Sequence, residues 1–418
     1  MLIEFTVGNY RSFKDPVTFS MVAAKLRAKD KTLDENTVFP LTDKISLLKS
    51  CAVYGANASG KSNLVHAFRF MRYFVLSSAT GLQVDERIDV DCFRLSTETE
   101  GESSFFEMVF FIDDKRYRYG FMVNKQKVHS EWLHHAKVKE TNLFYRENGE
   151  FELSSTFKEG KGLPEKTREN ALFLSVVAQF NGEIALTVLR WFRELEITYG
   201  IYDIILDIPL DRLDLGWVEW LEDPRLVEEI ISFVKQMDVG ISDIEVEFES
   251  DTSWPHPIPK VTALHRKYDG KKPDYSLVTF DLETHESEGT KKIFALAGPI
   301  LNALRDGKVF IIDELDARLH PLITEAIIRL FNSNETNPNN AQLVFTTHDT
   351  NLLTNKLFRR DQIWFTEKNK YGATDLYSLA EIKNVRSDAA FEKDYITGRY
   401  GAIPFIGGLY RLVGEGDG

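Results

Sequence analysis

Eight residues near the N-terminus restrict the fold of this chain more than any other feature. Gly55-Ala56-Asn57-Ala58-Ser59-Gly60-Lys61-Ser62 fits the pattern G-x-x-x-x-G-K-[ST]. The apolar run Leu47–Tyr54 before it predicts a buried strand, and apolar residues at helical spacing over Asn63–Val75 predict a helix after it. Glycines let such a turn curl so that backbone N–H groups point inward, at the positive end of the helix dipole. The segment Gly55–Asn63 therefore predicts a phosphate-binding loop in an α/β protein, with Lys61 on the phosphates and Ser62 on Mg²⁺.

A second motif supplies the acids that such a loop requires. Val309–Ile312 predicts a buried strand, and two carboxylates, Asp313 and Glu314, follow at its C-terminal end. Open α/β sheets bind their ligands at this end of the strands. We expect Asp313 to hold Mg²⁺ through water and Glu314 to act as the catalytic general base that polarises the attacking water. Together the two motifs predict that the chain binds and hydrolyses ATP with Mg²⁺.

The composition is that of an ordinary globular protein. Hydrophobic residues make up 43% and charged residues 28% of the 418 residues, so the chain can bury a sizeable core. No apolar run reaches the roughly 18 residues that cross a bilayer, and the N-terminus lacks a secretory signal. Cys51 and Cys92 are too few for a disulfide framework. We therefore expect a cytoplasmic protein without membrane contacts.

The charge balance bears on nucleic-acid partners. With 51 Lys and Arg against 64 Asp and Glu, the net charge is −13, which argues against nonspecific binding to nucleic acid. Two short basic clusters, at residues 25–31 and 265–272, are diluted by aspartates, and a solvated surface is the better interpretation of each. A local nucleic-acid contact stays open.

The pattern along the chain predicts three parts. Consecutive antiparallel strands are expected in the first, with turns at Asp113-Asp114 and Asn124-Lys125. Residues 166–240 are expected to be helical, residues 243–282 to form short strands, and the last third to alternate helix and strand, as βαβ units do. We divide the chain into an N-terminal ATPase lobe with an antiparallel β-subdomain (1–182), a helical insertion (183–240) and a C-terminal ATPase lobe (241–418).

Two further motifs indicate the class of ATPase. Ser287-Glu288-Gly289 precedes a predicted helix, and His348 follows the predicted strand Gln342–Thr346. Alone, the first is typical of a helix cap and the second of a surface histidine. Their joint order resembles the SMC/RecF-like branch of ABC-type AAA family ATPases. The resemblance implies that the signature Ser287–Gly289 closes over a γ-phosphate held by the opposite subunit. It also implies that His348 contacts the γ-phosphate and that Leu315-Asp316-Ala317 links the two sites.

Three more segments narrow the resemblance. Asn9-Tyr10-Arg11-Ser12-Phe13 resembles an N-terminal element of RecF-like ATPases, which implies that Arg11 and Ser12 lie near the nucleotide. Leu319-His320-Pro321 and Gly398–Pro404 resemble abortive-infection ATPases of the RloA/AbiLi and OLD type. The glutamine that senses Mg²⁺ in this class lies between the first two motifs. Gln179 is our candidate, and a loop glutamine without a role is an equal alternative.

The chain also departs from related classes. The signature lacks the LSGG form of transporter ATPases, and residues 183–240 are too short and too mixed for an SMC coiled coil. About 50 residues follow the predicted strand at 361–367, too few for the nuclease domain of OLD proteins. Any effector is therefore expected to be a separate polypeptide.

These observations lead to one architecture and three functional hypotheses. We expect a two-lobed α/β head that forms a head-to-tail homodimer around two Mg-ATP molecules, since Ser287 and Gly289 cannot reach their own phosphate loop. The first hypothesis is the ATPase of a prokaryotic antiphage (abortive infection) system, which controls a nuclease-like or toxin-like effector. The alternative is a RecF-like DNA-repair ATPase that acts as an ATP-dependent nucleic-acid clamp. The third is a nucleotide-binding scaffold with negligible turnover, against which Glu314 argues.

Overall fold

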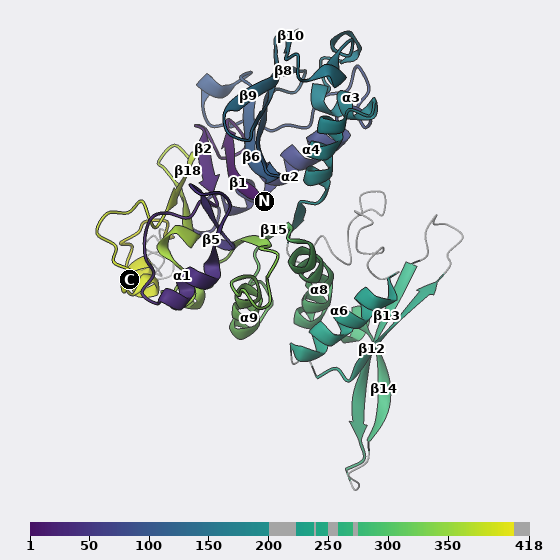
Figure 1. The fold of residues 1–418 in the computed structure, drawn as a ribbon. Coiled ribbons are helices and arrows are strands. Elements are labelled where there is room, and N and C mark those ends of the chain that lie inside the picture. The colour runs from purple at the N-terminus through teal and green to yellow at the C-terminus, as the bar shows by residue number, and fades with distance from the viewer. Residues whose placement is uncertain (200–222, 238–239, 250–257, 271–274, 405–418) are drawn as a thin grey trace, which may run out of the picture. The chain divides into compact units, whose positions relative to one another are not determined.

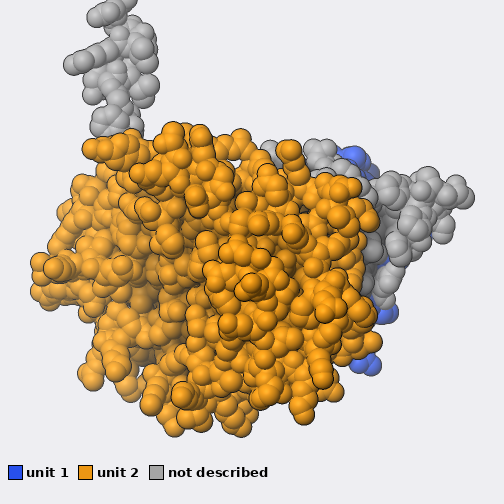
Figure 2. Space-filling view, turned by 90° about the horizontal axis from the view of Figure 1, so that it is seen from above, with its two compact units in different colours: residues 1, 194–347 blue, residues 2–193, 348–418 orange. Residues whose placement is uncertain are grey.

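The chain folds into two compact units. A computed structural model describes residues 1–199, 223–237, 240–249, 258–270 and 275–404 (Figure 1). Unit 1 comprises Met1 and residues 194–347, and unit 2 comprises residues 2–193 and 348–418; Figure 2 colours them blue and orange. Unit 2 is therefore assembled from two segments that are separated in sequence by unit 1. The division into 1–182, 183–240 and 241–418 stays a prediction, and residues 200–222 and 238–239 of the expected insertion lie outside the described residues.

A seven-stranded antiparallel sheet dominates unit 2. Its order is β10-β9-β8-β7-β6-β1-β2, and every neighbouring pair is antiparallel. Asp113 and Asp114 adopt φ of 46° and 61° in the tight turn between β6 and β7, as aspartates tolerate. The expected consecutive antiparallel strands are confirmed. The strands are β1 (Leu2–Gly8), β2 (Val17–Ser20), β6 (Ser104–Ile112), β7 (Lys115–Val123), β8 (Val128–Ala136), β9 (Glu140–Glu147) and β10 (Glu150–Leu153).

Three helices of unit 2 contribute to its core. The helix α2 (Lys61–Ser77) contacts both α3 (Phe173–Gln179) and α4 (Glu183–Arg193). The Phe5 ring on β1 stacks on Phe68 of α2 with 3.9 Å between centroids, and Phe110 on β6 stacks on Trp191 of α4 at 4.2 Å. These rings join the helices to the sheet, because aromatic side chains bury the largest apolar areas.

A second group of paired strands in unit 2 leads into the phosphate loop. The strand β5 (Ser50–Tyr54) is buried throughout and pairs in parallel with β17 (Ile363–Lys368). The hairpin partner of β17 is β18 (Thr374–Ser378), which runs antiparallel to it. Burial on both faces is typical of parallel strands and explains the apolar run that precedes the loop.

Three of the smaller elements of unit 2 lie between β2 and β5 in sequence, and a fourth follows β18. They are α1 (Lys31–Thr37), β3 (Val38–Pro40), β4 (Ser46–Leu48) and α10 (Phe391–Ile396). Cys51 is buried and Cys92 partly exposed, and both are free thiols. No helix within the described ranges is long and apolar enough to cross a membrane.

Unit 1 contains a parallel three-stranded segment and its helices. The strand β15 (Val309–Asp313) pairs in parallel with β11 (Glu196–Tyr199) on one side and with β16 (Gln342–Thr346) on the other. The expectation of helix throughout residues 166–240 is wrong at β11, because pairing of Glu196 with Phe310 in a parallel register overrides the local pattern. The helices α8 (Glu288–Asp306) and α9 (Pro321–Phe331) flank β15 in sequence, as expected for βα alternation.

An antiparallel meander completes unit 1. It consists of β12 (Asp243–Glu249), β13 (Ile258–Tyr268) and β14 (Tyr275–Asp281), with the short helix α7 (Leu282–His285) after it. The helix α6 (Pro224–Gln236) contacts α8 and β12. The structure confirms the short strands that the sequence predicts over 243–282.

Candidate nucleotide site

The phosphate loop occupies the turn from β5 to α2 in unit 2. Its backbone takes three unusual conformations, with φ of 155° at Gly55, 62° at Ala58 and 120° at Gly60. A non-glycine residue in the left-handed region is strained and persists only where its surroundings impose it. The helix begins directly after Gly60, whose N-cap position carries no side-chain hydrogen bond. This is the arrangement by which helix N-termini bind anions.

Both glycines of the motif are required by their neighbours. A Cβ on Gly55 would lie 2.5 Å from Ser59 Oγ and from the Thr366 carbonyl oxygen, and a Cβ on Gly60 would lie 2.4 Å from Thr374 Oγ1. Such distances are far inside van der Waals contact. The loop can therefore follow this path only with glycine at both positions.

The side chains of the loop have distinct environments. Lys61 is 5% exposed, and its ammonium donates hydrogen bonds to the carbonyl oxygens of Gly55 at 2.8 Å and Ala56 at 3.1 Å. The lysine thus curls over its own loop, where a phosphate is expected. Asn57 and Ala58 are exposed, and Ser62 is half-buried in the first turn of α2. The structure therefore places Gly55–Ser62 in the turn between β5 and the first residues of α2, with Lys61 folded back on the loop.

The N-terminal element lies directly beside this loop. Ser12 is buried, and its Oγ accepts a hydrogen bond from the side-chain amide of Asn63 at 2.8 Å. It also lies 3.0 Å from the position of a Cβ on Gly60. The half-exposed Arg11 has φ of 49°, and its guanidinium lies 5.6 Å from the centre of the Tyr10 ring. Ser12 and Asn63 are thus part of the loop's surroundings, and a contact of Arg11 with nucleotide stays a prediction.

Two threonines that sequence reasoning missed support the loop from β17 and β18. Ser59 Oγ and Thr366 Oγ1 lie 2.6 Å apart, and Thr374 Oγ1 donates to the Ser59 carbonyl oxygen at 2.8 Å. The Thr374 amide also donates to the Ser12 carbonyl oxygen at 2.7 Å. More than 300 positions separate each threonine from Ser59 (307 and 315), so no local pattern could have found them.

Gln179 is not brought to the phosphate loop by the contacts of its helix. It is exposed at the last position of α3. The hydrogen bonds between α3 and the region of α2 involve Val75 and Ser78. Val75 lies about 21 Å along the helix axis from Lys61, at 1.5 Å per residue. A role of Gln179 in Mg²⁺ binding stays a prediction, and a glutamine without a role stays the equal alternative.

The acidic motif is formed at the end of β15 in unit 1. Asp313 is 8% exposed and closes a strand that is buried throughout. Thr346 Oγ1 donates to the Asp313 carboxylate and accepts a hydrogen bond from the Glu314 amide at 2.7 Å. Glu314 itself is exposed, with φ of 51°. Thr346, at the end of β16, therefore holds the Asp313 carboxylate and the backbone of Glu314.

The signature lies at the start of α8 in the same unit. Ser287 caps this helix, since its Oγ accepts a hydrogen bond from the Thr290 amide at 3.2 Å. Glu288 forms ion pairs with Lys291 at 2.8 Å and with Arg318. A Cβ on Gly289 would lie 2.8 Å from the Arg318 carbonyl oxygen. The signature therefore packs against the loop that follows Glu314, and its contact with a second subunit's nucleotide stays a prediction.

One buried lysine joins the signature helix to the acidic loop. Lys292 is 1% exposed, and its ammonium donates to the carbonyl oxygens of Glu314 at 2.7 Å and Ala317 at 2.9 Å. Burial lowers the pKa of Lys292 to about 8, against the opposing effect of the carboxylates of Asp316 and Glu314. The lysine stays mainly charged at neutral pH. It thereby fixes the backbone on which Glu314 is mounted.

His348 lies two residues beyond β16, where the chain re-enters unit 2. It is exposed and precedes Asp349, which caps a short helical turn at Thr350–Leu352. The histidine is accessible to a ligand, and its contact with a γ-phosphate stays a prediction.

The oxygen donors expected for Mg²⁺ suit that ion. Ser62 offers a hydroxyl and Asp313 a carboxylate, and Mg²⁺ in phosphate-transfer sites is held by few protein oxygens together with substrate phosphates. No group of three or more His, Cys, Asp or Glu that could hold a metal occurs among the described residues.

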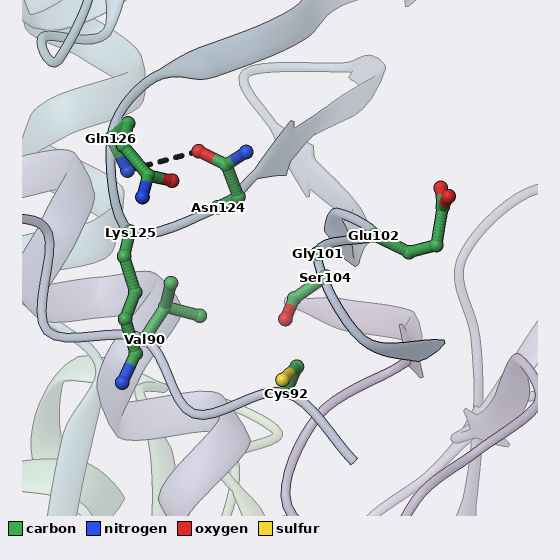
Figure 3. A pocket seen from close by; sticks show the side chains of 8 residues that line it. All are labelled: Val90, Cys92, Gly101, Glu102, Ser104, Asn124, Lys125 and Gln126. Carbon is green, nitrogen blue, oxygen red and sulfur yellow. Dashed lines mark hydrogen bonds between the residues drawn. The ribbon is translucent and has the colours of Figure 1, made fainter. Parts of the chain in front are cut away.

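A separate hollow in unit 2 is too small for a nucleotide. It has a volume of about 130 Å³, whereas ligand pockets usually span about 300–1,000 Å³. Figure 3 shows Cys92, Ser104 and Lys125 around it, with the turn at Asn124 closed by a hydrogen bond from the Gln126 amide at 2.9 Å. The phosphate loop is not among the residues that line it. The pocket is therefore excluded as the nucleotide site.

Comparison with known proteins assigns the family. The model of the family described as "AAA domain, putative AbiEii toxin, Type IV TA system" matches residues 51–354, which include the phosphate loop, the signature, the acidic motif and His348. This chain belongs to that AAA family. The expected membership in AAA ATPases of the abortive-infection kind is thereby confirmed. No curated protein matches the chain.

Solved structures also match this AAA protein. One of them is described as "Structure of the recombination mediator protein RecF-ATPrS in RecFOR pathway". It is 14% identical, covers 90% of this chain and 98% of its own, and superposes with a TM-score of 0.30. The mixed α/β fold class expected from the sequence is confirmed by the sheets and helices described above.

Proposed function

We propose that this AAA protein binds Mg-ATP at the phosphate loop and hydrolyses it. In this proposal Lys61 neutralises the β- and γ-phosphates, and Ser62 and Asp313 hold Mg²⁺. Glu314 orients the attacking water and accepts its proton, while His348 donates a hydrogen bond to the γ-phosphate. When bound by these residues, Mg²⁺ would offset the negative charge of the phosphates.

The observation that carries the proposal is the conformation of the loop itself. Three positive φ angles, two obligatory glycines and a buried lysine that bonds its own loop carbonyls coincide in one turn at the start of α2. Positive φ angles also occur in ordinary turns, but their combination with a helix N-terminus and a buried ammonium suits a polyanion.

Phosphate release by purified protein tests hydrolysis. We expect Glu314→Gln to lower kcat about 10²- to 10⁴-fold, as loss of a general base does, and to leave Mg-ATP binding intact. Lys61→Ala should abolish binding, as followed with a fluorescent ATP analogue. Glu325→Gln, on α9 and paired with Arg329, is the matched control and should behave as wild type. Equal turnover by wild type and Glu314→Gln would remove Glu314 from catalysis.

We further propose that two copies associate head-to-tail around two nucleotides. Contacts of the signature support its proposed role of binding the phosphate of a second subunit. Glu288 and Gly289 pack on the loop around Arg318, which holds the signature in place. A serine hydroxyl and backbone amides at the start of a long helix suit a phosphate. Light scattering of Glu314→Gln with and without Mg-ATP measures the association. A monomer under both conditions would contradict the proposal.

The cellular role that we propose is control of a separately encoded effector in antiphage defence. The description of the matching family, which names a putative toxin and a toxin–antitoxin system, supports this choice. Co-purification from the native operon should recover a partner protein of nuclease or toxin type, and deletion should raise phage sensitivity. Recovery of this chain alone, with unchanged phage sensitivity, would refute the role. Tight ATP-dependent binding to gapped duplex DNA would instead favour a repair clamp, which the net charge of −13 disfavours.

A further inference from the structure

The hairpin β17–β18 carries two buried hydroxyl groups for which the proposed chemistry has no use. Thr366 is 0% and Thr374 is 2% exposed, and both contact the phosphate loop. Neither is within the motif that defines the loop, and neither carries a charge. Their contacts nevertheless converge on Ser59, at the centre of the strained segment.

Thr374 makes the larger set of contacts. Its hydroxyl donates to the Ser59 carbonyl oxygen at 2.8 Å, and its amide donates to the Ser12 carbonyl oxygen at 2.7 Å. Its Cγ2 would lie 2.7 Å from a Cβ on Gly60, so the loop backbone rests directly on this side chain. One residue therefore contacts both the loop and the N-terminal element beside it.

Ser59 is consequently held at two points. The Thr374 hydroxyl bonds its carbonyl oxygen, and Thr366 Oγ1 lies 2.6 Å from its own hydroxyl. Ser59 is 4% exposed, so water cannot readily replace either partner, and a buried carbonyl without a partner is costly. Ala58 and Gly60, on either side, have φ of 62° and 120°. Strained conformations of this kind persist where neighbouring groups over-determine them.

We propose that Thr374 is a positioning residue that holds the phosphate loop preorganised for a nucleoside triphosphate. The inference rests on the proposed function and adds a residue outside the motif to it. A loop that is already shaped binds its ligand without the cost of ordering, so loss of the hydroxyl weakens binding. Because Thr374 contacts neither the acidic motif nor the signature in any hydrogen bond described above, KM rises and kcat stays near the wild-type value.

Removal of the hydroxyl at constant shape tests this inference. Thr374→Val is expected to raise the Kd for a fluorescent ATP analogue and the KM for Mg-ATP about tenfold, with kcat within twofold of wild type. Thr374→Ser keeps the hydroxyl and should restore both values to within about twofold. Ser378→Ala is the matched control, since Ser378 is a buried hydroxyl on the same strand that bonds the Ile363 carbonyl at the other end of the hairpin. It should lower the melting temperature without moving KM.

Amide hydrogen exchange of residues 55–62 in nucleotide-free protein tests the support separately from ATP binding. Faster exchange in Thr374→Val than in wild type and in Ser378→Ala would support the inference. This holds even if the wild-type protein binds no nucleotide, because the absence of binding would refute only the proposed function. Unchanged exchange and unchanged KM in a folded Thr374→Val protein would overturn it. If Thr374→Val does not fold, Thr366→Val, which removes the partner of the Ser59 hydroxyl, is subject to the same criteria.

Discussion

Substitution of Lys292 is expected to change the free energy of unfolding and the rate of hydrolysis to different extents. Burial lowers the pKa of Lys292 from 10.5 to about 8, so the folded protein bears about 3 kcal/mol to keep this ammonium charged at pH 7, at about 1.4 kcal/mol per pKa unit. Lys292→Met relieves this cost and forfeits two hydrogen bonds from a charged donor, each worth about 1.5–3 kcal/mol. The loss of about 3–6 kcal/mol equals or exceeds the gain of about 3 kcal/mol. The free energy of unfolding should therefore fall by about 0–3 kcal/mol relative to wild type.

Hydrolysis should respond differently, because the carbonyl oxygens of Glu314 and Ala317 lose the group that fixes them. Misplacement of a catalytic group by about 1 Å can cost about 10²-fold in rate. We therefore expect kcat of Lys292→Met to fall at least tenfold. Urea unfolding and phosphate release measure the two quantities, and Lys308→Met, whose ammonium bonds Asn302 and Asp306 instead, is the control. A wild-type kcat in Lys292→Met would refute the reasoning.

The same lysine gives the stability a defined pH dependence. Its pKa is lower in the folded state, so between about pH 8 and 10.5 the unfolded chain binds more protons than the folded one. Stability relative to Lys292→Met must then rise with pH across this window, by up to about 3 kcal/mol, and show no such rise below pH 7. Unfolding free energies at pH 7, 8, 9 and 10 check the sign. A difference that falls with pH would contradict the assignment.

Three further substitutions have definite outcomes. Gly60→Ala places a Cβ 2.4 Å from Thr374 Oγ1 at a φ of 120°. Strain of this kind costs about 1–3 kcal/mol, so calorimetry should show at least about fivefold weaker Mg-ATP binding. A wild-type Kd would be inconsistent with the loop geometry. Gly289→Ala pushes on the Arg318 carbonyl at 2.8 Å and should reduce ATP-dependent association in the Glu314→Gln background, which light scattering would detect. Glu131→Ala removes a buried carboxylate that accepts the amides of Phe173 and Leu174 and lies 3.8 Å from the Arg146 guanidinium. It should cost about 3–5 kcal/mol in urea unfolding, and a loss below 1 kcal/mol would show that the group is dispensable.

Local sequence patterns predict the elements that carry the site. The apolar strand, the glycines and the helix around Lys61 are contiguous, and so are the strand and acids at Asp313, so their structure follows from neighbours along the chain. The meander over residues 243–282 is also predictable from short alternating strands. By contrast, Glu196–Tyr199 is a strand because of its pairing with β15, which no local window contains.

The supports of the site cannot be predicted in the same way. Thr374 is 315 residues away from Ser59 in sequence, and an isolated threonine in a strand has no distinguishing pattern. Lys292 follows the signature closely, but two adjacent lysines are typical of a solvated helix, and only the structure shows that one is buried on carbonyl oxygens. Gln179 is a candidate for Mg²⁺ sensing only because it lies between two motifs in the sequence. Position in the sequence carries no information on the distance between Gln179 and the phosphate loop.

The dependence of Ser59 on Thr374 also has a consequence for protein synthesis. Ribosomes add about 5–20 residues per second, so the 315 positions between these two residues correspond to about 15–60 s of translation. During that interval the glycine-rich turn has emerged while its scaffold has not yet been made. A nascent chain should therefore reach its full affinity for nucleotide only after the hairpin β17–β18 has docked on the loop.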